Sequence, residues 1–190
     1  MTLYVVRHGR TEANATGKLL GRADPDLDEL GRRQAADLAA VLPADARVVS
    51  SPLRRCVQTA ETLGRPVEVD PRLVELDYGE FDLIPLSEVP ADVWRRWRSD
   101  ETFRPPGGET LVELADRVGA CLDDLSGDAA GGNVVAVTHV SPVKAAMAWA
   151  LGVGIGVSWR SFVATASITT IGVSDRGVSL QGFNAVGHLR

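Results

Sequence analysis

The segment that most constrains the fold is residues 3–9, in which four apolar residues lead directly into Arg7, His8 and Gly9. A short uninterrupted apolar run is typical of a strand that is buried on both faces of a sheet. Polar residues after such a strand lie at its carboxyl end, where open α/β sheets bind their ligands. The segment therefore predicts a central strand with Arg7 and His8 at a binding edge.

Two later segments repeat this arrangement of an apolar run followed by polar residues. Residues 134–139 end in a histidine, and residues 48–55 end in two adjacent arginines. The pairs Ser51-Pro52 and Ser141-Pro142 predict helix starts there, because serine is a good N-cap and proline suits the first helical position. Histidines and arginines would thus gather beside helix N-termini, which favours an anion, and phosphate is the usual one.

Strands and helices alternate along most of the chain. Helices are expected at 28–42, 52–63, 109–125 and 142–151. Strands are expected at 3–6, 47–50, 67–69, 134–138, 167–173 and 178–184, with an extended piece at 73–76 and a tight turn at 175–177. This alternation predicts a single α/β domain over residues 1–190, a three-layer α/β/α sandwich with a mostly parallel central sheet.

Residues 79–107 interrupt the alternation, and we interpret them as a cap inserted over the strand ends. The stretch contains four prolines and the sequence Trp94-Arg95-Arg96-Trp97-Arg98, which predicts a short helix. We favour a solvated helix whose tryptophans pack inward. One of the four cap arginines could instead bind a second anionic group of a substrate; they are Arg95, Arg96, Arg98 and Arg104. Inserts at this edge usually determine substrate choice.

The composition restricts the class of protein. The 190 residues suffice for one sizeable core, and the net charge of −5 argues against a general nucleic-acid binder. No signal peptide and no membrane-spanning stretch is visible. Cys56 and Cys121 fall within predicted helices without metal-ligand spacing, and three histidines are too few for a metal cluster. We therefore expect a cytoplasmic protein with no disulfide, metal or membrane contact.

Six short motifs follow one another along the chain. They are Arg7-His8-Gly9 with Thr11 and Asn14, Leu20-Gly21 with Asp24 and Leu27, Ser51-Pro52-Leu53-Arg54-Arg55 with Gln58-Thr59-Ala60, Glu75 with Tyr78-Gly79, Pro106-Gly107-Gly108-Glu109-Thr110, and Thr138-His139. In this order, over nearly the whole chain, they resemble the histidine phosphatase superfamily, also called phosphoglycerate mutase-like. The resemblance implies the phosphoglycerate mutase-like fold. It also implies phosphoryl transfer through a phosphohistidine, without a metal ion or a cofactor.

The resemblance also implies catalytic roles for individual residues. His8 is expected as the nucleophile, because one imidazole nitrogen can attack phosphorus while a hydrogen bond, expected from the backbone, holds the other. Arg7 and Arg55 are expected to clamp the phosphate, and the family spacing selects Arg55 over Arg54. His139 is expected to stabilise the transferring phosphoryl group without attacking it.

The general acid and base is less well defined by the sequence, which offers four neighbouring carboxylates: Glu75, Asp77, Glu80 and Asp82. The resemblance favours Glu75, which would protonate the leaving alcohol and then accept a proton from water. The family often has an aromatic-Glu-Gly sequence where this chain has Phe81-Asp82-Leu83. The start of the cap is therefore expected to follow its own path.

Four further residues are expected to bind substrate: Asn14, Thr11, Gly21 and Val140. Asn14 and Thr11 would add neutral hydrogen bonds, although Thr11 serves equally well as a plain helix cap. Val140 would offer its backbone N–H, and it stands where the family usually has glycine. A valine cannot easily copy a glycine-only backbone conformation, so the local geometry is expected to be an ordinary one.

These features favour a phosphomonoesterase that acts on a small phosphorylated metabolite, similar to α-ribazole phosphatase-like and compact acid phosphatase members of the family. One alternative is a phosphoglycerate mutase-type transfer, which the family performs in longer chains with larger insertions. Another is a non-catalytic binding domain, although such relatives usually lack one of the histidines or arginines. The last strands could pair across a homodimer.

Overall fold

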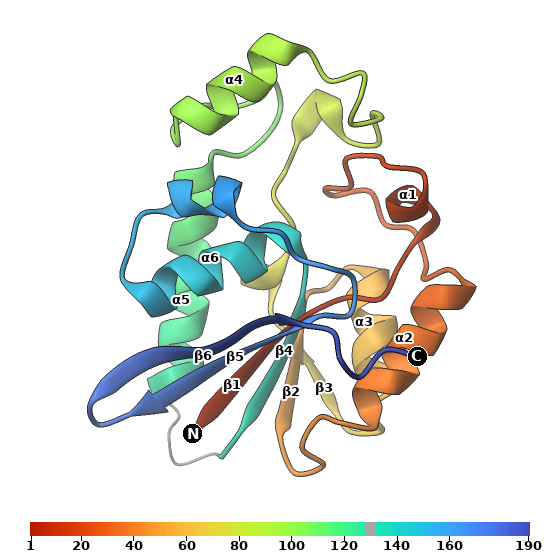
Figure 1. The fold of residues 1–190 in the computed structure, drawn as a ribbon, viewed down its shortest axis with the longest axis vertical. Helices are drawn as coiled ribbons and strands as arrows, with labels where there is room; N and C mark the ends of the chain where they lie inside the picture. Colours follow the sequence, from red (N-terminus) through yellow and green to blue (C-terminus); the bar gives the residue numbers. More distant parts are fainter. Residues whose placement is uncertain (128–131) are drawn as a thin grey trace.

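A six-stranded sheet forms the centre of the molecule in the computed structural model, which describes residues 1–127 and 132–190 (Figure 1). The strands are β1 (Thr2–Arg7), β2 (Arg47–Ser50), β3 (Val67–Val69), β4 (Val134–Thr138), β5 (Ile168–Ser174) and β6 (Gly177–Ala185). Their order is β3-β2-β4-β1-β5-β6. The first four are parallel, and β5 runs antiparallel to both β1 and β6, so the predicted mostly parallel sheet is confirmed.

Helices cover both faces of this sheet, as the apolar runs predicted (Figure 1). Helices α5 (Leu111–Gly127) and α6 (Val140–Leu151) pack on one face, and α2 (Glu29–Ala39) and α3 (Arg54–Glu61) pack on the other. Neighbouring residues of β1 point to opposite cores, Val5 toward α5 and α6 and Val6 toward α2 and α3. A strand with both faces covered has no solvent side, which explains its unbroken apolar sequence.

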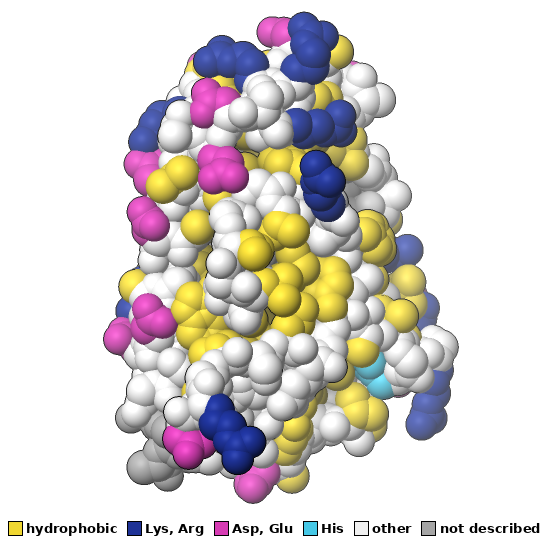
Figure 2. Space-filling view, turned by 60° about the vertical axis from the view of Figure 1, so that its left-hand side comes forward, with side chains coloured by type: hydrophobic (Ala, Val, Ile, Leu, Met, Phe, Trp, Pro, Cys, Tyr) yellow, Lys and Arg dark blue, Asp and Glu magenta, His cyan; other side chains and the backbone are white. Residues whose placement is uncertain are grey.

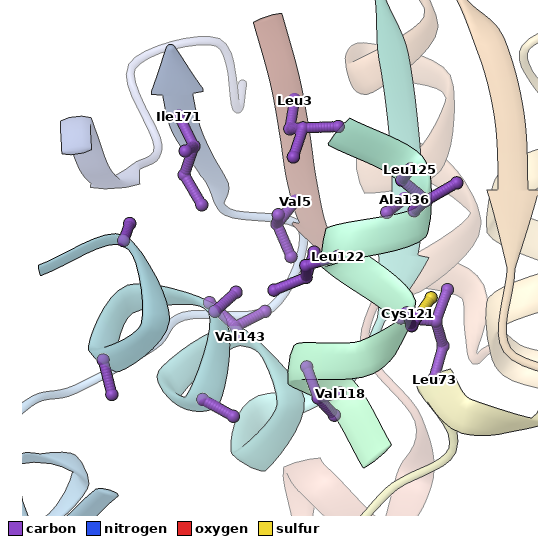
Figure 3. Close-up of a cluster of buried hydrophobic side chains, with 14 of the residues drawn as sticks. Leu3, Val5, Leu73, Val118, Cys121, Leu122, Leu125, Ala136, Val143 and Ile171 are labelled. Atoms are coloured by element: carbon purple, nitrogen blue, oxygen red, sulfur yellow. The ribbon is translucent and has the colours of Figure 1, made fainter. Parts of the chain in front are cut away.

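The larger core lies between the sheet and α5 (Figure 3). The helix predicted at 109–125 corresponds to α5, and its apolar stripe is buried, with Leu114, Val118 and Leu122 no more than 1% exposed. Each such side chain contributes about 1.5–3 kcal/mol by leaving water. The start of α5 is fixed by Thr110 and Glu113, whose side chains exchange hydrogen bonds with each other's backbone N–H groups.

Several element boundaries differ from the predicted ones. Helix α2 ends at Ala39, α3 begins at Arg54, and α6 begins at Val140 rather than two residues later. The residue that caps α6 is His139, so the predicted capping role of Ser141 was wrong. The reason is that first-turn N–H groups have no partner within a helix, so Pro142 is tolerated at the third position.

The segment expected to be extended at 73–76 is not a strand. It begins in the short 3₁₀ helix η1 (Pro71–Leu73) and continues as irregular chain toward the cap. The short helix α1 (Glu12–Ala15) follows β1, which confirms the expectation that Thr11 serves as a helix cap. The last two strands form the expected hairpin, in which Asp175 and Arg176 make the turn and Gly177 has a φ of 110°.

The cap contains η2 (Gly79–Phe81) and α4 (Ala91–Ser99) and lies over the carboxyl ends of the parallel strands (Figure 1). Trp97 is buried at its centre and makes edge-on ring contacts with Tyr78, Phe81 and Phe103. Another 3₁₀ helix, η4 (Ile155–Arg160), completes the surroundings of the cap, where Trp159 meets Trp94 edge-on. None of the helices described is both long and apolar enough to cross a bilayer.

Candidate active site

A pocket of about 530 Å³ opens between the cap and the carboxyl ends of β1 and β4. Five of the nine expected site residues line it, namely Arg7, His8, Asn14, Glu75 and Val140. The other four, Thr11, Gly21, Arg55 and His139, are not among its lining residues, and each is buried. The expected residues therefore form two groups, one that faces the pocket and one that supports it from behind.

His8 follows β1 directly and is almost wholly buried. Its Nδ1 donates to the carbonyl oxygen of Gly9 at 2.6 Å, and Arg55 Nε donates to its Nε2 at 3.2 Å. The proton is therefore on Nδ1, and Nε2 keeps its lone pair. Burial lowers the pKa of His8 well below 6.5, and the positive charges of Arg55 and Arg7 lower it further, so the ring is neutral near pH 7.

Gly9 is required at this place by a close backbone approach. A Cβ on Gly9 would lie 2.4 Å from the carbonyl oxygen of Gly31, and a Cβ on Gly31 would lie 2.0 Å from that of Arg10. The Gly9 N–H donates to Thr59 Oγ1 at 3.1 Å, which ties the segment to α3. These contacts hold the backbone that carries His8 between the start of α2 and the body of α3.

His139 lies beside His8, with 5.1 Å between the ring centroids. Its Nδ1 accepts the same Arg55 Nε–H at 3.1 Å, and its Nε2 lies 2.8 Å from Ser51 Oγ. Burial, followed by the charge of Arg55, lowers the pKa of His139 well below 6.5. The neutral ring donates from Nε2 to Ser51.

Arg55 is fully buried and occupies the space beneath both histidines. Its terminal nitrogens donate to the carbonyl oxygens of Ala23 at 2.7 Å and Gly21 at 2.8 Å. The same loop is held from its N–H side, because Asp82 accepts from Gly21 N at 2.8 Å and from Ala23 N at 2.7 Å. Asp82, the 21–23 loop and Arg55 thus form one connected network that reaches His8.

Arg7 reaches the pocket from the end of β1. Its Nη1 donates to the carbonyl oxygen of Val163 at 2.7 Å, whereas its buried Nε has no hydrogen-bond partner in the part of the chain that is described. Burial lowers the pKa of Arg7 to about 10, so the guanidinium remains charged. An unmet donor on a buried cation is a suitable contact for a phosphate oxygen.

Of the four candidate carboxylates, only Glu75 is among the residues that line the pocket. Its carboxylate accepts from Leu76 N at 2.7 Å and from Ser141 N at 3.1 Å, so it sits at the N-terminus of α6. Asp77 instead accepts from Gly79 N, Asp82 supports the 21–23 loop, and Glu80 is exposed. The pocket geometry therefore favours Glu75 over the other three carboxylates, a choice that the sequence alone left open.

The expected substrate-binding residues have different surroundings. Thr11 caps α1 and exchanges hydrogen bonds with Asn14, whose side chain lies at the pocket. Gly21 contacts Arg55 and Asp82 rather than the pocket. Val140 lines the pocket as the first residue of α6 and is not among the non-glycine residues with positive φ, which are Leu83, Ala166 and Asn184. The valine thus needs no glycine-like backbone conformation.

Sequence reasoning missed three residues of this region. Ser51 was interpreted only as a helix start, Asp82 only as a rival acid, and Lys144 was not singled out, yet Lys144 lines the pocket. Lys144 is four residues after Val140, and this helical spacing would have placed both side chains on one face. The contacts of Asp82 with residues 21–23 join segments far apart in sequence, and no local pattern indicates them.

The four cap arginines do not line the pocket. Arg96 lies over the Phe103 ring, Arg98 lies near the Trp94 ring, and Arg104 pairs with Glu113. Figure 2 shows Lys and Arg side chains gathered over the top of the molecule, with a hydrophobic area below them. The favoured interpretation of a solvated helix agrees with this arrangement, although Trp94 lines the pocket instead of being fully buried.

Within residues 1–127 and 132–190, no group of three His, Cys, Asp or Glu side chains is placed to hold a metal ion. Cys56 and Cys121 are both free and buried. Cys56 Sγ lies 3.3 Å from His139 Nε2, and burial raises the pKa of its thiol. This cysteine therefore packs as a neutral group against the second histidine.

A family model, relatives of similar sequence and a solved structure of similar fold all match this chain over nearly its whole length. The family model of the histidine phosphatase superfamily, branch 1, matches residues 3–186. A bifunctional protein of Mycobacterium tuberculosis is 35% identical over 198 aligned residues, which cover 98% of this chain and 54% of that protein. The chain thus spans about half the length of this mycobacterial relative. Phosphoserine phosphatase 1 of Hydrogenobacter thermophilus is 31% identical, with 98% of this chain and 93% of that protein covered.

A solved structure shows the same fold. The mycobacterial glucosyl-3-phosphoglycerate phosphatase in complex with VO3 superimposes with a TM-score of 0.87 at 31% identity, covering 97% of this chain and 99% of that one. The family model covers nearly all of the chain. In the structure, Arg55 lies within hydrogen-bond distance of His8 and His139, and Arg7 lines the same pocket as His8. The chain belongs to the histidine phosphatase superfamily, branch 1.

Proposed function

We propose that this chain hydrolyses phosphate monoesters of small metabolites through a phosphohistidine on His8, without a metal ion or cofactor. The observation that carries the proposal is the state of the His8 ring. Because Nδ1 donates to Gly9 at 2.6 Å and the pKa is well below 6.5, Nε2 is unprotonated beside the pocket. An unprotonated nitrogen in fixed orientation is the form of imidazole that attacks phosphorus.

In the first step the substrate phosphate binds Arg7 and the Asn14 side chain, both at the pocket. His8 Nε2 forms a bond to phosphorus while the bond from phosphorus to the alcohol oxygen breaks. Glu75, in its protonated form, gives its proton to the departing oxygen, so the alcohol leaves neutral. Arg55 and His139 lie beside the reacting nitrogen, where they stabilise the charge of the transferring group.

In the second step water attacks the phosphohistidine. The Glu75 carboxylate removes a proton from this water as the new oxygen–phosphorus bond forms and the bond from Nε2 to phosphorus breaks. Inorganic phosphate leaves, and both Glu75 and His8 return to their starting protonation states. The hydrogen bond from His8 Nδ1 to Gly9 fixes the ring through both steps, so the same nitrogen acts as nucleophile and leaving group.

The substrate class follows from the size of the pocket and from the named relatives. A volume of about 530 Å³ is typical of a site for a small molecule. The relatives are named for phosphoserine and for glucosyl-3-phosphoglycerate, both small phosphorylated metabolites. A mutase-type transfer between hydroxyls is the alternative, and product analysis separates it from hydrolysis.

The test is phosphate release from a panel of monoesters without added metal, including p-nitrophenyl phosphate, α-ribazole phosphate, phosphoserine and 3-phosphoglycerate. We expect wild-type turnover, with loss of activity in His8→Ala and retention in His188→Ala, which removes a histidine outside the pocket. Isomerised phosphoglycerate with little free phosphate would establish a mutase instead. No turnover of any substrate, or full activity in His8→Ala, would contradict the proposal.

We further propose that the protein acts in the cytoplasm and forms a homodimer. The two cysteines are free and buried, which is typical of proteins from a reducing compartment. Strand β6 is an edge of the sheet, and an edge offers unpaired backbone groups to a second copy. Light scattering on the purified protein should give the mass of two chains, and the mass of one chain at all concentrations would refute the dimer.

A further inference from the structure

The pocket extends beyond the catalytic groups into a second region that no step of the proposed reaction uses. Its walls there are mostly apolar and come from the cap, from η4 and from the segment after it; they include Leu86, Trp94, Trp159 and Phe162. Phe162 lines the pocket and is 72% exposed, so its ring is accessible to a bound ligand. The alcohol part of a substrate bound at His8 would extend into this region.

One charged side chain of α6 faces this region, that of Lys144. It lines the same pocket as Glu75 and Arg7, and it is half-buried. Burial lowers the pKa of Lys144, the Glu75 carboxyl raises it, and the Arg7 charge lowers it. In the described part of the chain, the Lys144 ammonium nevertheless makes no hydrogen bond or ion pair.

The other basic residues near this region are paired with a carboxylate, do not line the pocket, or are exposed to solvent. Arg10 pairs with Asp28 at 2.7 Å, and the cap arginines do not line the pocket. The chain has 20 basic residues, of which only Lys18 and Lys144 are lysines, and both line this pocket. Lys18 is exposed, whereas Lys144 is half-buried beside the catalytic groups. A half-buried ammonium without a partner is suited to an anion that arrives with the substrate.

We propose that Lys144 is a specificity-determining residue that binds a carboxylate on the alcohol part of the substrate, so that the pocket selects monoesters that combine an apolar body with an acid group. The proposal rests on the proposed hydrolysis and names its substrate class. A single ammonium carries one positive charge, which matches a singly charged carboxylate better than a second, doubly charged phosphate. The apolar walls contact the rest of the alcohol and exclude water from the ion pair.

The test compares two substrates with the same reacting group, phenyl phosphate and 3-carboxyphenyl phosphate. In the wild type we expect kcat/KM to be about tenfold higher for the carboxylated ester, as a charge-assisted hydrogen bond would provide. Lys144→Met should abolish this preference, and Lys144→Arg should retain most of it. Lys18→Met is the matched control, because it removes the other lysine of the pocket and should leave the ratio of the two values unchanged.

The outcomes separate the inference from the function on which it rests. If the wild type hydrolyses neither ester, the proposed function fails. If it hydrolyses both and Lys144→Met lowers both kcat/KM values equally, Lys144 acts on Glu75 or on folding, and the inference is wrong. Loss of the preference in Lys18→Met but not in Lys144→Met would also overturn it. If Lys144→Met does not fold, Lys144→Gln carries the same comparison.

Discussion

At the scale of single residues, the site depends on two neutral histidines that share one donor. Arg55 Nε lies 3.2 Å from His8 Nε2 and 3.1 Å from His139 Nδ1, so one N–H is directed at both lone pairs. A phosphoryl group bound between the rings would offer oxygen acceptors to the same donor. The resting arrangement thus keeps both rings oriented in the absence of substrate.

The burial of these neutral rings makes stability depend on pH. Both pKa values are lowered in the folded state, so below about pH 6.5 the unfolded chain binds more protons than the folded one. The free energy of unfolding should therefore fall as the pH decreases from 6.5, by at most about 1.4 kcal/mol per pH unit for each histidine. Urea unfolding of the wild type and His8→Gln should show a shallower decrease in the variant. Equal slopes would contradict this account.

Ser51 positions His139 through the 2.8 Å contact with Nε2. Replacement by alanine leaves this buried ring nitrogen with only the weak contact to Cys56 Sγ at 3.3 Å, and the loss of the Ser51 hydrogen bond costs about 1–3 kcal/mol. We expect Ser51→Ala to lower kcat by roughly tenfold to a hundredfold with a smaller change in KM, since ring orientation acts on the transition state. Ser50→Ala is the control, because Ser50 is equally buried but its hydroxyl donates to the Ser51 carbonyl oxygen and not to a histidine. Similar kcat values in both variants would refute a positioning role.

At the scale of elements, the site is built where loops from distant parts of the chain meet. The loop at 21–23 holds Arg55 by its carbonyl groups, and Asp82 at the start of the cap holds that loop by its N–H groups. The cap is therefore connected to the catalytic centre through hydrogen bonds as well as through packing. This connection gives a structural role to the carboxylate of Asp82, which stands where the sequence departs from the usual family pattern.

Asp82→Asn tests this connection. The carboxylate accepts from two backbone N–H groups, whereas an amide has one accepting oxygen and would direct its NH2 group at the other donor. We expect kcat to fall about tenfold or more as the 21–23 loop loses its fixed position and Arg55 loses its support. Glu80→Gln, on the exposed side of the same segment, should have wild-type activity. Wild-type activity in Asp82→Asn would show that the 21–23 loop keeps its position without the Asp82 carboxylate.

The sequence predicted those elements whose pattern is local. Apolar runs located β1 and β4, and helical periodicity located α2 and α5, because burial on two faces or on one stripe leaves a repeating pattern. The predicted start of α6 was two residues too late. Ser141 lies in the first turn, where its N–H donates to Glu75, 66 positions away in the sequence, and no local pattern indicates this contact. The piece expected at 73–76 has extended backbone angles at Val74 but is not a strand of the sheet, and Thr138 Oγ1 donates to the Leu73 carbonyl oxygen there.

The same distinction holds for the site. Its candidate residues could be named because strand ends and family motifs carry them, and the structure brings His8, His139 and Arg55 within hydrogen-bond distance. Which of them face the pocket could not be predicted, because Arg55 and Gly21 bond to each other and lie behind it. The place of Lys144 and the support from Asp82 depend on tertiary contacts that no local pattern records.

At the scale of the whole molecule, the cap has a hydrophobic cluster of its own. Leu19, Val89, Trp97 and Phe103 form this cluster, separate from the two cores that flank the sheet. The cap is joined to the rest through backbone pairing, with Leu19 N donating to Ile84 O at 2.9 Å and Leu83 N donating to Leu19 O at 2.8 Å. The buried residues of the cap cluster belong to neither core, whereas the partly buried Tyr78 and Trp159 pack against both this cluster and the larger core.

Trp97→Ala should loosen the cap while the sheet stays folded. Truncating a buried tryptophan costs about 3–5 kcal/mol, and here the loss falls on the small cap cluster. We expect faster proteolysis within residues 79–107 and a higher KM. Trp149→Ala is the matched control, because Trp149 is half-buried on α6 outside the cap and should leave the cleavage pattern unchanged. Global unfolding in place of local cleavage would contradict a separately stabilised cap.

The central claim is that His8 Nε2 carries the phosphoryl group. The most direct measurement is mass spectrometry of Glu75→Gln after brief reaction with p-nitrophenyl phosphate. The nitrophenolate leaves without a general acid, so the variant can still transfer the phosphoryl group to His8. Hydrolysis of the phosphohistidine needs the general base that the variant lacks, so the phosphorylated form should accumulate. We predict that one acid-labile phosphoryl group accumulates on the peptide containing His8, and that it is absent when His8 is also replaced by Asn. A phosphoryl group on His139, or product formation with no labelled histidine, would contradict the mechanism.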